Sequence, residues 1–201
     1  MRSLIAILLV CASLNGTAWA QQAQPAAARV SWENFQDITN AAYTFASALD
    51  HQDWTKMRTV FADKVDVDTT GANNGTGKAT ITAETFIWRV KVTETGFDGT
   101  QLLMGNPQVE VNGDRARLVV GFYGEHVAAV VSGDNFYTIG GYQTFELHRT
   151  NGRWLIDGFR LSPMWTKGNR DIMTIGVRRG LERLTQRGDP PPAEIAAAMK
   201  W

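Results

Sequence analysis

The stretch QVEVNGDRARLVVGFYGEH, residues 108–126, decides the fold of this chain. On both sides of Asn112-Gly113, apolar and polar residues alternate with a period of two, as in strands with one buried face. Asn-Gly readily adopts the positive φ of a tight hairpin turn. The stretch YQTFELHRTNGRWLIDGFRL, residues 142–161, repeats this pattern around Asn151-Gly152. The two hairpins predict an antiparallel sheet in the second half of the chain.

Helices are predicted mainly before this sheet. Apolar residues recur at intervals of three or four over residues 32–49, which predicts an amphipathic helix. Asp53 suits the N-cap of a short second helix. Residues 78–92 are predicted as a third helix, although their β-branched side chains disfavour one. With a further helix over 171–184, helices first and an antiparallel sheet afterwards predict an α+β fold.

The composition fits one globular domain. The chain has 201 residues, of which 44% are hydrophobic, so a substantial core can form. Lysine plus arginine and aspartate plus glutamate number 20 each. This balance gives no electrostatic basis for binding nucleic acid or an acidic membrane surface.

The first twenty residues resemble a secretory signal. Arg2 supplies a positive charge, residues 4–12 are apolar, and Ala18-Trp19-Ala20 is a small-x-small cleavage site. The apolar run is shorter than the ~18 residues of a membrane span. We therefore expect an exported protein, periplasmic or secreted, with no integral membrane segment in its mature form; an uncleaved anchor is the alternative. Cys11 is the only cysteine, so the mature chain has no disulfide and no thiol nucleophile.

The order of several motifs resembles the SnoaL-like, scytalone-dehydratase-like branch of the nuclear transport factor 2-like superfamily. The motifs are LDHQDW at 49–54, GFDGTQ at 96–101, NGDRA at 112–116, NGRWLI at 151–156, and Trp165. The resemblance implies a cone-shaped α+β barrel, in which three N-terminal helices pack on a strongly curved, mostly antiparallel sheet around an apolar cavity. The expected organisation is a signal at 1–20, a flexible lead-in at 21–31, the SnoaL-like domain at 32–170, and a C-terminal helix and tail at 171–201.

The resemblance also implies a site in which a histidine acts as acid and base and an aspartate orients it. Asp50 stands where the family's aspartate is expected, with a turn or capping role as the alternative. His126 matches a family histidine on the sheet and shares strand parity with Phe122, so it should point inward. Gln143 stands near the family's asparagine and shares parity with Phe145. A structural histidine and a sheet-bonding glutamine are the alternatives.

Three positions depart from the family pattern. Leu102 stands where the resemblance implies a first sheet histidine, and Leu49 and Thr69 stand where it implies tyrosines. Dehydration of scytalone itself is therefore not expected. Leu49, Thr69, Leu102 and Trp165 are expected to line the pocket, together with Gln143.

The functional expectation is a pocket for a small apolar or polyketide-like molecule. A histidine with a pKa near neutrality can accept and return a proton, which suits a lyase or isomerase that needs no cofactor. The sequence has no dinucleotide-binding, phosphate-loop or zinc-protease motif, and its three histidines form no convincing metal site. The alternatives are a domain that only binds a ligand and a dimeric assembly domain that pairs through its sheet.

Overall fold

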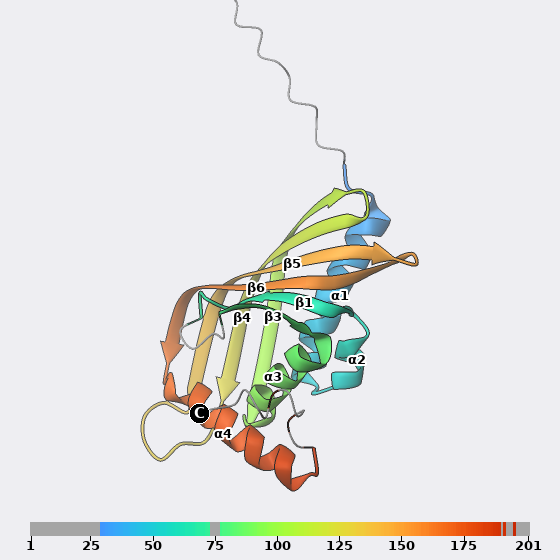
Figure 1. Ribbon diagram of the computed structural model, residues 1–201. Helices are drawn as coiled ribbons and strands as arrows, with labels where there is room; N and C mark the ends of the chain where they lie inside the picture. Colours follow the sequence, from blue (N-terminus) through green and yellow to red (C-terminus); the bar gives the residue numbers. More distant parts are fainter. Residues whose placement is uncertain (1–28, 73–76, 190, 192–194, 196–201) are drawn as a thin grey trace, which may run out of the picture.

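The computed structural model describes residues 29–72, 77–189, 191 and 195. The expected signal, most of the lead-in and the end of the tail lie outside these residues. The described chain forms one curved sheet, with helices on its inner side and across one end (Figure 1). The helices and strands, in chain order, are α1 (Trp32–Asp50), α2 (Trp54–Arg58), β1 (Phe61–Asp68), β2 (Lys78–Thr82), α3 (Ala83–Thr95), β3 (Gly99–Asn112), β4 (Arg115–Val127), β5 (Phe136–Thr150), β6 (Arg153–Gly168) and α4 (Asp171–Gln186).

The sheet has six strands in the order β2-β1-β6-β5-β4-β3. Only the β1–β6 pair is parallel; the other neighbours are antiparallel. The two expected hairpins are present, with positive φ at Gly113, Asn151 and Gly152. The α+β prediction is confirmed by this architecture.

Bulges bend the sheet. On β3, Gly105 pairs with Gly121 but Gln108 pairs with Val119, so one extra residue lies on β3. On β6, Trp165 pairs with Gly140 while Pro163 pairs with Gly141, which leaves Met164 as the extra residue. Bulges increase the local bend and twist of a sheet. They help to give this sheet the curvature that encloses a space.

Side-chain caps fix the helix starts. Ser31, Asp53 and Thr82 each accept a hydrogen bond from the backbone N–H three residues later. The cap at Thr82 corrects the sequence prediction for residues 78–92. Residues 78–82 form strand β2, which pairs with β1, and the helix occupies 83–95 instead.

One end of the sheet's inner face is filled by aromatic rings. Five phenylalanines from α1, α3 and three strands pack with centroid distances of 5.1 to 6.3 Å. They are Phe45, Phe61, Phe86, Phe145 and Phe159. Burial of aromatic side chains contributes strongly to a core, so this cluster anchors α1 and α3 to the sheet.

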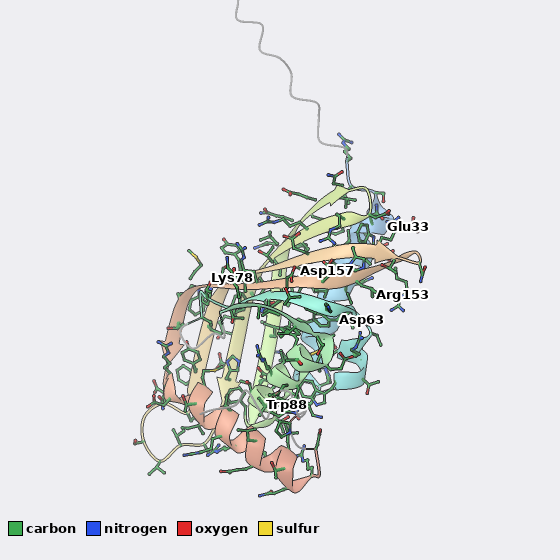
Figure 2. All side chains as sticks on the ribbon, viewed as in Figure 1. Glu33, Asp63, Lys78, Trp88, Arg153 and Asp157 are labelled. Carbon is green, nitrogen blue, oxygen red and sulfur yellow. The ribbon has the colours of Figure 1, made fainter. Side chains whose placement is uncertain are left out.

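Helix α4 crosses the other end of the sheet and packs on α3 (Figure 1). The two helices approach closely, because a side chain at Gly96 would collide with the backbone of Gly176, and one at Gly180 with that of Val92. Trp88 on α3 is buried in this region (Figure 2). None of the described helices combines the length and the apolarity that crossing a bilayer requires.

Candidate functional site

A cavity of about 350 Å³ lies between the inner face of the sheet and helices α1, α3 and α4. Its volume falls at the lower end of the range for small-molecule sites. Phe45, Phe86 and Phe159 of the aromatic cluster form part of its wall. Polar side chains enter it from α3, β4 and β5; they include Glu94, His126 and Gln143.

Strand parity places two of the expected residues at this cavity. Strand β4 runs without a break in its register against β5, so His126 lies on the same face as Phe122. Gln143 on β5 shares the buried face with Phe145 in the same way, and is 4% exposed. Both side chains line the cavity.

The His126 ring is held by its backbone neighbour across the strands. Its Nδ1 lies 3.3 Å from the carbonyl oxygen of Tyr137, which can only accept a hydrogen bond. Nδ1 must therefore carry the proton, and in the neutral ring Nε2 keeps a lone pair. The ring of Phe97 packs beside it at 4.8 Å. Burial lowers the pKa of His126, which favours the neutral ring.

Glu94 was missed by the sequence analysis. It lies in the last turn of α3, lines the cavity and is 7% exposed. Its Oε1 is 3.9 Å from His126 Nε2. Burial, with the nearby Asp50 carboxyl, raises the pKa of Glu94 to about 8. The available signal was helical spacing, because Glu94 follows Ile87 and Val90 on the same inward face.

Asp50 is the last residue of α1 and lies beside the cavity without lining it. Its Oδ1 accepts a hydrogen bond from the Leu102 N–H at 2.9 Å, which ties α1 to β3. Burial raises the pKa of Asp50, while that N–H and His51 act in the opposite direction. Within the described chain, no hydrogen bond or ion pair joins Asp50 to His126. The contact that holds the ring comes from Tyr137 instead.

Gln143 carries an unusual feature for a buried amide. Its Oε1 is buried and has no hydrogen-bond partner among the described residues. An unpaired buried polar atom costs free energy, so such an atom in a cavity marks a place for a ligand group. Here that group would be a hydrogen-bond donor, such as a hydroxyl.

The expected lining residues divide into two groups. Leu49, Thr69 and Leu102 line the cavity as expected. Trp165 does not: it lies on the outer face, 49% exposed, with its ring over Gly140 and 5.9 Å from the ring of Tyr123. The physical reason for this correction is the bulge at Met164. The extra residue reverses the alternation of β6, so Thr166 faces the cavity and Trp165 faces outward.

A second, more open groove lies at the other side of the sheet. Its polar lining includes Asp63, Arg153 and Asp157, which come from β1 and β6 (Figure 2). Asp157 Oδ2 is 2.9 Å from His148 Nδ1 and also accepts a hydrogen bond from Arg115. The Asp157 carboxylate therefore already has protein partners. Across the described residues, no group of histidine and carboxylate side chains is arranged to hold a metal ion.

The described residues build a curved sheet and helices around a small-molecule pocket. The family model for the SnoaL-like domain matches residues 31–160, and the chain belongs to this family, within the nuclear transport factor 2-like superfamily.

Solved structures share the fold at low identity. The protein Kfla4162 from Kribbella flavida is 17% identical with a TM-score of 0.66, over 71% of this chain and 97% of that one. A proposed scytalone dehydratase from Novosphingobium aromaticivorans is 16% identical with a TM-score of 0.58, over 69% and 89%. A hexachlorocyclohexane dehydrochlorinase, LinA type 2, is 12% identical with a TM-score of 0.58, over 68% and 89%. No curated protein sequence matches this chain.

Proposed function

We propose that this protein is a cofactor-independent lyase or isomerase that moves a proton on a small, largely apolar molecule bearing a carbonyl group. The observation that carries the proposal is the His126 ring at the cavity, held through Nδ1 by the Tyr137 carbonyl, with Nε2 3.9 Å from the cavity-lining Glu94. A positioned imidazole with a free lone pair is a suitable general base. Two of the similar structures bear the names dehydratase and dehydrochlorinase, which denote eliminations.

The other polar groups have supporting roles in this proposal. Gln143 Oε1 accepts a hydrogen bond from a substrate hydroxyl, because it has no described protein partner. Asp50 acts indirectly: it fixes β3 through Leu102 and places negative charge near Glu94. The apolar walls at Leu49 and Leu102 exclude water and favour a hydrophobic substrate body. Export is part of the proposal on the basis of residues 1–20, which lie outside the described residues.

The test uses the β-hydroxy ketone formed by aldol addition of acetone to benzaldehyde. Its dehydration gives benzylideneacetone, which is followed by ultraviolet absorbance. In deuterated water, exchange of the hydrogens next to the carbonyl reports proton removal alone. The His126→Ala variant should lower both rates about 10²-fold or more. His148→Ala is the matched control, because His148 lies on the outer face and pairs with Asp157.

The outcomes separate the lyase from the alternatives. Equal rates in wild type and His126→Ala would contradict the assignment of the base. Saturable binding of the ketone by calorimetry, with neither dehydration nor exchange, would contradict catalysis and support a domain that only binds its ligand. Failure to bind any small apolar ketone would contradict the pocket itself.

A second proposal concerns assembly as a homodimer. The outer face of the sheet exposes a cluster of large side chains: Leu103, Tyr123, Tyr142, Met164 and Trp165. Exposed apolar clusters of this kind are typical of protein interfaces. We propose that a second copy of the chain covers this face. A monomeric mass in solution at micromolar concentration would contradict it.

A further inference from the structure

Glu94 is a buried carboxyl group that the proposed function does not use. Its side chain reaches the cavity from the C-terminal turn of α3. Oε2 is buried and has no hydrogen-bond partner among the residues described. A glutamate is seldom buried without a partner, because the ionised group loses its hydration. Its presence at a cavity calls for a functional reason.

The groups around Glu94 offer its negative charge no full compensation. From α1, Asp50 adds like charge. From β4, His126 is 3.9 Å away and tends to be neutral. From α4, Arg183 donates to the carbonyl oxygens of Thr95 and Phe97 and pairs with Asp98 instead. Arg89 on α3 and Arg170 at the start of α4 also line the cavity, but in the described parts of the chain no ion pair joins Glu94 to a lysine or arginine.

The position of Glu94 in its helix adds to this effect. The C-terminal end of a helix carries a partial negative charge, which disfavours an anion there. Burial, like charge and the helix end therefore all favour the protonated carboxyl, and the pKa of Glu94 is raised to about 8. At neutral pH the group is mainly a carboxylic acid, which can donate a hydrogen bond and then a proton.

We propose that Glu94 is the general acid of this site and His126 its general base, so that the two catalyse elimination as a pair. The proposal rests on the proposed function above, and it names the chemistry: loss of water from a β-hydroxy carbonyl compound. Acid and base lie at the same end of the cavity, as the removal of a proton and a hydroxyl from adjacent carbons requires.

The step balances without any further reactant. His126 Nε2 takes the proton from the carbon next to the carbonyl, and that C–H bond breaks. Its electron pair first passes to the carbonyl group as an enolate, and then forms the C=C bond as the bond from the neighbouring carbon to the hydroxyl breaks. Glu94 gives its proton to the departing oxygen, so the products are an enone and water. The site is left with a protonated His126 and an ionised Glu94.

The geometry also provides the return step. The charged His126 and Glu94 are then at ion-pair distance, 3.9 Å in the resting structure, and attract each other in a poorly solvated cavity. Passing the proton from Nε2 to the Glu94 carboxylate restores both groups to their starting states. A tyrosine or second histidine, absent at positions 49, 69 and 102, is not needed in this scheme.

The experiment compares Glu94→Gln with the control Glu110→Gln, which lies at an exposed position on β3. The probe is the same ketone adduct of acetone and benzaldehyde. Glutamine keeps the shape and a hydrogen-bond donor but cannot give up a proton. The kcat for dehydration should fall about 10²-fold or more with KM changed only a few-fold. Exchange of the hydrogens next to the carbonyl should persist, because His126 is intact.

These readouts distinguish the two proposals. Dehydration at the wild-type rate in Glu94→Gln would overturn the inference, while the loss in His126→Ala would still support the proposed function. Wild-type rates in both variants would overturn both. Binding of benzylideneacetone by each variant shows that the fold and cavity are retained.

A further measurement does not depend on turnover. Carbon-13 NMR of the glutamate side-chain carboxyls, with Glu94→Gln used for assignment, gives the protonation of Glu94 directly. Titration near 8 supports the inference, and titration near the ordinary glutamate value of 4.5 overturns it.

Discussion

The inner face of the sheet has a filled end and a hollow end, although the same strands run through both. At the filled end, Leu118 on β4 and Leu147 on β5 are fully buried against the helices. At the hollow end, the corresponding positions on these strands are Gly124, His126 and Ile139, and they line the cavity. The difference is one of side-chain size and polarity at equivalent inward positions. A single alternating pattern therefore builds both a core and a site.

The cover over the two ends also differs. The filled end is closed by α1 and by the aromatic rings of the cluster. The hollow end is covered by the last turn of α3 and by α4, which contributes Met173 to the cavity wall. Because α3 and α4 meet at glycines, their backbones lie close together over this end. Stability should depend mainly on the first end and chemistry on the second.

The sharpest test of this division is a matched pair of leucine truncations. Leu147→Ala removes a fully buried side chain and should lower the free energy of unfolding by about 2–5 kcal/mol. Leu161→Ala removes a partly buried side chain that already borders the cavity, so its cost should be about half of that or less. Urea unfolding measures both. Equal losses would show that the two ends are packed alike.

The pH dependence of stability tests the hollow end at Glu94. The folded protein keeps the Glu94 proton up to about pH 8, whereas the unfolded chain loses it near 4.5. Between these values the folded state binds more protons, so this group makes the free energy of unfolding fall as the pH rises. The fall is at most about 1.4 kcal/mol per pH unit. It should be present in wild type and absent in Glu94→Gln.

The measurement is urea unfolding of both proteins at several pH values from about 5 to about 8. The raised pKa of Asp50 also makes the free energy of unfolding fall as the pH rises, and the lowered pKa of His126 makes it rise. Both residues remain in the variant. The difference between the two curves therefore isolates Glu94. The Glu110→Gln control should run parallel to wild type. A difference between wild type and Glu94→Gln that is constant across this range would contradict a protonated Glu94.

The part of this molecule that could be predicted from sequence is the part set by local pattern. The hairpins followed from Asn-Gly turns, and the inward positions of His126 and Gln143 followed from strand parity along an unbroken register. Strand β2 could not be recognised in the same way. It pairs with β1 across an intervening segment of sequence, residues 69–77, and its last residue, Thr82, is already the N-cap of α3.

Glu94 was missed for a related reason. The third helix was predicted over residues 78–92, with β-branched side chains that disfavour a helix, so Glu94 fell beyond its expected end. Packing against α4 overrides that preference, and the helix continues to Thr95, which carries Glu94 onto the cavity face. The expectation that Asp50 orients His126 depends on the distance between elements far apart in the sequence. Such distances are set by tertiary packing, which a single sequence does not display.

The smallest expected effect concerns Trp165, whose outward position depends on the Met164 bulge. Trp165→Ala removes an exposed ring from the outer face, so turnover of the β-hydroxy ketone and its binding should stay within about twofold of wild type. The stability cost within a single chain should be about 1 kcal/mol or less, as is usual for exposed positions, and any weakening of the proposed dimer is separate from it. A loss of ketone affinity as large as that of a cavity-lining variant would show that the Trp165 ring lies in the cavity. The inward and outward alternation of β6 would then continue unbroken from Leu161.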